Sequence, residues 1–182
     1  MDTIINLAQD FVGSNNINLL KPVGQFGTRL QGGKDASSPR YIFTQLSKEF
    51  RDIFNPEDFE LLEYLDDDGY PIEPKFYVPT LPMILINGAC GIGTGFSSDV
   101  PCFKPDDIKE RLLRLVDDED AEIKEMTPWY KNFTGNIYKT EHNKWTTEGV
   151  YTVYTNKIII TEFGAYLYYN NKHLYLNLYG YF

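Results

Sequence analysis

One stretch restricts the fold of this 182-residue chain more than any other: GSNNINLLKPVGQFGTRLQGGKDASSP, residues 13–39. It is typical of a long loop and holds glycines at positions 24, 27, 32 and 33. Glycine lets the backbone enter conformations that other residues avoid, and it lets backbone amides approach a bound group closely. We therefore expect irregular backbone here, with helices and strands on either side.

Two helices and a strand are predicted around this loop. Asp2 can cap a helix that Gly13 can end, because apolar residues recur at helical spacing at Ile4, Ile5, Ala8, Phe11 and Val12. Residues 40–46 predict a strand, since β-forming side chains follow one another from position 41 to 44. Ser47 precedes a short predicted helix at 48–54, which the Asn-Pro pair at 55–56 ends.

Farther along, predicted strands outnumber helices. Strands are expected at 61–65 and 76–78, on either side of a turn at 66–71. Pro105 opens a predicted amphipathic helix whose apolar face carries Ile108, Leu112, Leu115 and Val116. Further strands are expected at 137–138, 150–154 and 157–161, so the pattern predicts an α+β fold.

Composition excludes several classes of protein. The two cysteines, Cys90 and Cys102, form no C-x-x-C pair, and with two histidines they predict neither a zinc site nor a disulfide framework. The sequence contains no run of about 18 apolar residues, so no membrane span is predicted. The first residues lack the basic start of a signal peptide. We expect a soluble protein of a reducing compartment that is not secreted.

The charge of the chain is unevenly distributed. The net charge of −9 and the pI of about 4.7 argue, taken as averages, against binding to nucleic acid. Residues 21–51, however, hold six basic and two acidic side chains, whereas 52–77 hold nine acidic and one basic, and 104–126 nine acidic and five basic. A polyanion responds to the field within a Debye length of about 8 Å, so the basic segment can bind one. Chance variation of charge along the chain is the alternative.

A second glycine cluster, at positions 88, 91, 93 and 95, matches no nucleotide-binding motif. Phe96 breaks the pattern G-x-G-x-x-G, and no Gly-Lys-Ser/Thr follows, so we assign no nucleotide site. Ile92 stands among these glycines, either in a buried tight turn or as an exposed apolar wedge that can enter between base pairs. The three acids at 66–68 are more typical of a solvated hairpin turn than of a metal site, and no metal ligand is assigned.

The pattern alone does not distinguish one nucleophile among the 14 tyrosines. Tyr41 follows Arg40, but consecutive residues of a strand point to opposite faces. The two side chains can act as a pair only if the backbone at Pro39 is irregular or if the arginine reaches around the strand.

Three segments in this order resemble the type IIA DNA topoisomerases, most closely their eukaryotic and giant-virus branch. They are NLAQDFVGSNNINLLKPVGQFGTRLQGGKDASSPRYIF (6–43), PTLPMILINGACGIGTGF (79–96) and WYKNFTGNIY (129–138). The resemblance covers roughly residues 4–163 and implies a fragment of the DNA breakage-reunion core. In domain terms it implies the C-terminal part of a winged-helix domain at 1–78 and the start of a tower, or shoulder, domain with antiparallel strands at 79–163.

The resemblance also implies roles for individual residues. Tyr41 matches the tyrosine that attacks a DNA phosphodiester and forms a 5′-phosphotyrosyl link, and Arg40 matches the arginine that assists it. Ile92 matches the isoleucine that intercalates into the cleaved DNA and bends it. The glycine-rich loop supplies three further DNA-binding candidates, Gln25, Arg29 and Lys34.

The same resemblance implies an ATP-hydrolysing, Mg²⁺-dependent homodimer that passes one DNA duplex through another. In the family, metal is held by acidic residues of a Toprim domain that precedes this segment, so we expect neither Mg²⁺ nor ATP on residues of this chain. The isolated chain is expected to be inactive. The location is expected to be nuclear, or cytoplasmic in a viral factory.

Two departures from the family keep alternatives open. Cys90 stands where eukaryotic relatives usually carry Glu, and the Tyr- and Asn-rich tail at 164–182 does not match the family. That tail is either out-of-frame translation of A/T-rich DNA or a genuine pair of aromatic strands. The chain is accordingly a fragment of the enzyme, a split subunit needing a separate Toprim/ATPase chain, a non-catalytic DNA-binding remnant, or a truncated product with no function.

Overall fold

The computed structural model describes residues 1–122, 125–142 and 144–165. Its helices are α1 (Asp2–Ala8), α2 (Phe50–Ile53), α3 (Met83–Ile86) and α4 (Pro105–Asp117), with 3₁₀ turns η1 (Arg29–Gln31), η2 (Pro39–Tyr41) and η3 (Pro56–Leu61). Its strands are β1 (Leu20–Val23), β2 (Phe43–Leu46), β3 (Tyr64–Asp67), β4 (Tyr70–Pro74), β5 (Ala89–Gly93), β6 (Phe96–Val100), β7 (Asn136–Glu141), β8 (Lys144–Glu148), β9 (Val150–Val153) and β10 (Ile158–Glu162).

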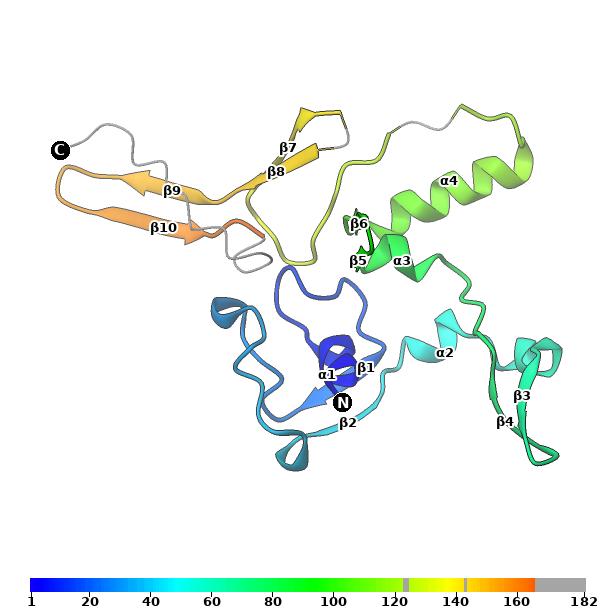
Figure 1. The fold of residues 1–182 in the computed structure, drawn as a ribbon. Helices are drawn as coiled ribbons and strands as arrows, with labels where there is room; N and C mark the ends of the chain where they lie inside the picture. The colour runs from blue at the N-terminus through cyan, green and yellow to red at the C-terminus, as the bar shows by residue number, and fades with distance from the viewer. Residues whose placement is uncertain (123–124, 143, 166–182) are drawn as a thin grey trace.

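The strands of the described part of the chain form five separate antiparallel pairs rather than one sheet. The pairs are β1–β2, β3–β4, β5–β6, β7–β8 and β9–β10. The β3–β4 and β9–β10 pairs extend away from the centre on opposite sides, and α4 lies above α3 (Figure 1). The predicted α+β class is confirmed, although β5, β6 and β8 were not predicted and the glycine-rich stretch contains β1.

The helix α1 ends earlier than the apolar spacing predicts. It ends at Ala8 rather than at Gly13, and Met1, not Asp2, is its N-cap. Gln9 is extended, and its carbonyl accepts hydrogen bonds from the side chains of Asn15 and Asn18 at 2.9 and 2.6 Å. These downstream amides satisfy a carbonyl at the helix end in place of a further turn.

The segment that carries Tyr41 is not the continuous strand that its β-formers predict. Pro39–Tyr41 form the 3₁₀ turn η2, and the strand begins only at Phe43. From there β2 pairs with β1, with Val23 opposite Phe43 and Leu20 opposite Leu46. Pro22 is compatible with β1 because the strand lies at an edge of a two-stranded pair.

Other predicted boundaries shift by a few residues. The helix predicted at 48–54 is shortened to Phe50–Ile53, and the strands predicted at 61–65 and 76–78 are replaced by β3 and β4. Asp68 and Gly69 both have positive φ, at 52° and 86°, which is the backbone of a two-residue hairpin turn and sets this register. The acids at 66–68 are therefore exposed at a hairpin, as expected, but Asp66 and Asp67 end β3 and only Asp68 lies in the turn. The Asp66 carboxylate accepts the Gly69 N–H at 2.9 Å.

The helix predicted from Pro105 is confirmed as α4. Pro105 opens it, and Asp106 and Asp107 occupy its first turn, where carboxylates favour the helix dipole. Ile108 is buried as predicted, but Val116 is exposed. No helix in the described ranges has the length and apolarity that a membrane crossing requires.

Little apolar surface is fully buried, and polar side chains join the segments instead. Ile86 and Ile108 are the largest fully buried side chains, and a second cluster contains Cys102, Tyr130 and Ala165. Between them lies Asn16, which is 6% exposed although it is polar. A buried amide of this kind is tolerated only if its donors and acceptor are satisfied.

Asn16 joins four parts of the chain. Its Nδ2 donates to the carbonyls of Ile86 and Trp129, each at 2.9 Å, and to that of Phe103 at 3.3 Å. Its Oδ1 accepts the Lys131 N–H at 2.8 Å.

Asn87 makes a second amide link to the same loop. Its Oδ1 accepts the Ile17 N–H at 2.9 Å and its Nδ2 donates to the Ile17 carbonyl at 2.8 Å. The two asparagines together hold the 13–18 loop against α3 and against the segment that precedes β7. We call these contacts the asparagine frame.

We predict that Asn16→Ala destabilises the chain by about 3 kcal/mol, because it leaves several buried backbone groups without a partner. Denaturant unfolding followed by circular dichroism measures the loss. The matched control is Asn136→Ala, because Asn136 is an exposed asparagine of β7. Equal stability of the two variants would contradict the role given to Asn16.

Candidate nucleic-acid interface

The turn η2 presents Arg40 and Tyr41 together on the surface. Tyr41 is 71% exposed, and its N–H donates to the Ser38 carbonyl at 2.9 Å, which closes the turn. The Arg40 guanidinium carbon lies 5.7 Å from the centre of the Tyr41 ring. The irregular backbone that a functional pair requires is therefore present at Pro39, and both side chains are open to solvent.

The loop that leads to this turn is closed by its own hydrogen bonds. The Asp35 carboxylate accepts the backbone N–H and the hydroxyl of Thr28, both at 2.8 Å. The Thr28 N–H is the main cause of a pKa of Asp35 below its usual value, since it favours the charged form. The Ser37 N–H donates to the Gln25 carbonyl at 2.9 Å, so both ends of the loop meet just before Pro39.

Glycine is required where this loop crosses itself. Gly27 has a φ of 102°, and a Cβ on it would lie 2.5 Å from the backbone of Gly33. Gln9 holds the same crossing, because its Nε2 donates to the carbonyls of Phe26 and Gly33 at 3.0 and 3.3 Å. The loop is therefore fixed to the segment that follows α1. No pattern in the sequence indicated this role of Gln9.

The candidate DNA contacts of the loop differ in their surroundings. Gln25 and Lys34 are exposed near the crossing. Arg29 is instead turned away into the protein, where its Nη1 lies 2.7 Å from the Glu162 carboxylate and its Nη2 donates to the Phe163 carbonyl at 2.8 Å. Glu162 lies far along the chain, close to its C-terminal end, so no local pattern around Arg29 indicated this contact.

Ile92 lies on a projecting hairpin rather than in a loop. In β5–β6, Ile92 is opposite Ser97 and Gly93 is opposite Phe96, and the strands are joined through Gly95, whose φ is 85°. Ile92 is 90% exposed, so the interpretation as a buried tight turn is wrong.

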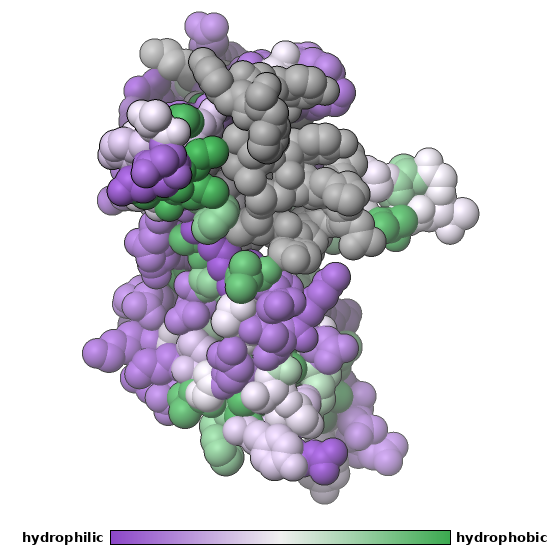
Figure 2. Space-filling view, turned by 90° about the vertical axis from the view of Figure 1, so that its left-hand side faces the viewer, coloured by the Kyte–Doolittle hydropathy of each residue, from purple (hydrophilic) through white to green (hydrophobic). Residues whose placement is uncertain are grey.

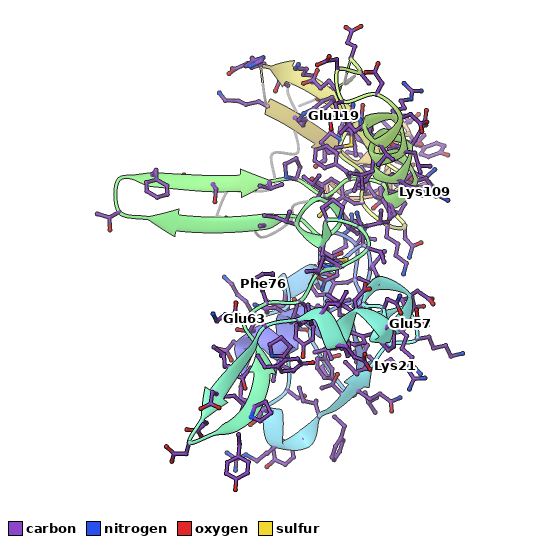
Figure 3. The ribbon with its side chains drawn as sticks, turned by 90° about the vertical axis from the view of Figure 1, so that its right-hand side faces the viewer. Lys21, Glu57, Glu63, Phe76, Lys109 and Glu119 are labelled. Carbon is purple, nitrogen blue, oxygen red and sulfur yellow. The ribbon has the colours of Figure 1, made fainter. Side chains whose placement is uncertain are left out.

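The hairpin extends well beyond the rest of the chain. It projects between the lower part, which carries Lys21 and Glu57, and the upper part, which carries Lys109 and Glu119 (Figure 3). From the opposite side the projecting part shows apolar residues among weakly polar ones (Figure 2).

Phe96 is a second exposed apolar group on this hairpin, which sequence reasoning missed. It is 76% exposed, and its ring lies where a side chain at Gly93 would be, 3.0 Å from the position of a Cβ. Because residues 92 and 93 are neighbours in a strand, Ile92 and Phe96 point to opposite faces of the hairpin. The hairpin thus presents apolar surface on both faces near its tip.

The two cysteines lie in different environments. Cys90 is exposed on β5, and Cys102 is buried. Burial raises the pKa of the Cys102 thiol to about 11, with a contribution from Asp99, so this thiol stays neutral and unreactive near pH 7. The residues that the structure describes hold no cluster of three or more His, Cys, Asp or Glu that could bind a metal ion. This part of the chain therefore offers no set of ligands that fits Mg²⁺.

Comparison with known proteins assigns the family. The family model of DNA gyrase/topoisomerase IV matches residues 1–170. The chain belongs to the type IIA DNA topoisomerase family. The resemblance seen in the sequence is thereby confirmed.

Type IIA relatives and a solved structure agree with this assignment. The chain is 49% identical over 172 residues to DNA topoisomerase 2 of Candida albicans, which covers 94% of this chain and 12% of the relative. It is 54% identical over 149 residues to human DNA topoisomerase 2-alpha, which covers 82% of this chain and 10% of the relative. The crystal structure of the Plasmodium falciparum topoisomerase II DNA-binding, cleavage and re-ligation domain superimposes with a TM-score of 0.82 at 47% identity, covering 90% of this chain and 22% of that one. The chain thus spans about a tenth of the length of these two curated type IIA relatives.

Proposed function

We propose that this chain forms part of the DNA-cleaving core of a type II DNA topoisomerase, with Tyr41 as its nucleophile. The observation that carries the proposal is the exposed Arg40–Tyr41 pair on an irregular turn. Membership of the family and the likeness to a DNA-binding, cleavage and re-ligation domain support it.

The chemistry is a reversible transesterification. The Tyr41 hydroxyl oxygen attacks phosphorus, and a bond from phosphorus to Tyr41 forms as the bond to the 3′ oxygen breaks. The phenol loses a proton, the 3′ oxygen gains one, and the 5′ phosphate is left as an aryl ester on Tyr41. A phenolate is a good leaving group, so the 3′ hydroxyl can reverse the step without a new source of energy.

Arg40 has the charge that this step requires. Negative charge builds up on the oxygens of the five-coordinate phosphorus, and a guanidinium stabilises it through charge-assisted hydrogen bonds. Arg40 is exposed and adjacent to the nucleophile in the turn, so its guanidinium can stay in contact with the phosphate during the reaction.

The projecting hairpin and the basic loop form the proposed DNA surface. Gln25 and Lys34 lie on the loop that ends at η2 and would contact the phosphate backbone. Ile92 would enter between base pairs, where the cost of unstacking is offset by the contacts that a bent duplex makes.

The domain assignment and the assembly are part of the same proposal. Residues 1–78 would belong to a winged-helix domain and residues 79–163 to the start of a tower domain. The complete enzyme would be a homodimer in which each subunit cleaves one strand of the duplex. The bound Mg²⁺ and ATP would belong to the complete enzyme rather than to residues of this chain. The location would be nuclear, as the eukaryotic branch suggests.

A chimera tests the nucleophile. Residues 4–163 replace the matching segment of the Candida albicans enzyme, and covalent protein–DNA complexes are trapped by denaturation and counted. Tyr41→Phe should lower their yield by at least about a thousandfold, because the attacking oxygen is absent. Tyr70→Phe is the matched control, since Tyr70 is 74% exposed on β4.

One outcome contradicts the assignment of Tyr41, and another contradicts the inactivity expected of the isolated chain. Covalent complexes that persist in Tyr41→Phe would place the nucleophile elsewhere. Covalent complexes formed by the isolated chain with Mg²⁺ would show that it cleaves DNA without the rest of the enzyme, against the inactivity that we propose for it.

Ile92→Ala tests the wedge separately from the chemistry. The variant should bend a fluorescently labelled duplex less, as read by energy transfer between its ends, and bind it about tenfold more weakly, because burial of an isoleucine side chain is lost. Ile72→Ala on β4 is the control, since Ile72 is an exposed isoleucine of another hairpin. If Ile92→Ala bends the duplex as much as the parent does, Ile92 does not enter between base pairs.

A further inference from the structure

Arg29 was expected to bind a DNA phosphate, but its guanidinium already has partners within the chain. Nη1 forms an ion pair with Glu162 at 2.7 Å, and Nη2 donates to the carbonyls of Phe163 and Gly164 at 2.8 and 3.4 Å. The planar fork of arginine suits such a set of a carboxylate and neighbouring carbonyls, and a lysine cannot reproduce it.

Both carboxylate oxygens of Glu162 also bind partners within the chain. It is 7% exposed, and its Oε2 accepts the N–H and the hydroxyl of Thr134 at 3.0 and 2.8 Å. Its Oε1 accepts the Phe163 N–H at 3.0 Å in addition to the arginine. Burial alone would raise the pKa of this carboxyl, but the hydrogen bonds from Thr134 and Arg29 outweigh it and lower the pKa.

The pair is positioned to fix the loop that carries Tyr41. Arg29 opens the turn η1, one residue after Thr28, and Thr28 is bound to Asp35 on the far side of the loop. Ser37 then closes the loop onto Gln25, directly before η2. On one side the loop is held by Gln9, and on the other by the bond from Arg29 to Glu162 at the end of β10.

We infer that Arg29 is a positioning residue, which with Glu162 fixes the Tyr41 loop against the end of β10, and is not a phosphate ligand. We call this contact the loop anchor. The inference rests on the proposed function, since it explains how the nucleophile of that function is held. Removing one partner from a largely buried ion pair is costly because the other charge stays behind unpaired.

Three variants of the chimera distinguish an anchor from a phosphate contact. Arg29→Lys keeps the charge that a phosphate needs but loses the fork, and we expect it to lower the yield of cleaved DNA about tenfold. Glu162→Gln should lower it by a similar factor. The double variant should be no worse than either single one, because all three break the same contact.

Three results would overturn the inference. One is full activity of Arg29→Lys, and a second is a double variant in which the effects of the two single variants multiply to about a hundredfold. The third is a fall of about 0.9 in the slope of the salt dependence of DNA binding in Arg29→Gln, which is the signature of one lost phosphate contact. The control is Arg114→Gln, which removes the exposed pair of Arg114 with Glu110 and should change nothing measurable.

Hydrogen exchange on the 182-residue chain tests the anchor without any catalysis. The N–H groups of Gly33 and Ser37, which close the loop, should exchange at least about tenfold faster in Arg29→Gln and Glu162→Gln than in Arg114→Gln. The N–H of Ile17, held by Asn87, should be unaffected. If the chimera never cleaves DNA but exchange changes as expected, the proposed function fails and the anchor stands. If exchange is unchanged while the chimera cleaves, the anchor fails.

Discussion

The buried amide of Asn16 is the contact on which the other parts of this structure depend. Four backbone groups from three segments converge on one side chain, and Asn87 binds the same loop a second time. Buried polar groups carry a large penalty when unpaired, so this set is formed completely or not at all. The asparagine frame therefore acts as a single junction between the N-terminal loop, α3 and the approach to β7.

Polar contacts have this importance because the apolar core is small. Ile86 and Ile108 are fully buried, but the five strand pairs are separate, and those of β3–β4 and β5–β6 lie largely in solvent. A two-stranded pair is at best marginally stable by itself, so its orientation is set where it leaves the junction. The hairpin with Ile92 leaves shortly after Asn87, and the loop with Tyr41 is fixed by Gln9 and by the loop anchor. Few contacts thus determine where the two proposed DNA-contacting elements point.

The sequence predicted the features that depend only on residues close together in the chain. Pro105 with two following aspartates opened α4 as expected, and the acids before Gly69 formed a hairpin turn. The strand β1 was missed because Leu20–Val23 contains a proline and gains its partner only from residues 43–46. The length of α1 was wrong because asparagines outside the helix satisfy its last carbonyls. Arg29 was assigned to DNA from its charge, and only the fold reveals Glu162 beside it. Residues 166–182, which hold nearly all of the Tyr- and Asn-rich tail, lie outside the described part, and the family model matches as far as residue 170. Both interpretations of that tail therefore stay predictions.

We propose that the Tyr41 turn and the Ile92 hairpin contact one and the same DNA duplex. A crystal structure of the chimera with a duplex that carries its cleavage sequence tests this most directly. We expect a bent duplex with Ile92 between two base pairs and a backbone phosphate within reach of the Tyr41 hydroxyl and the Arg40 guanidinium. A straight duplex that leaves Ile92 in solvent, or one whose phosphates lie away from Tyr41, would contradict the claim.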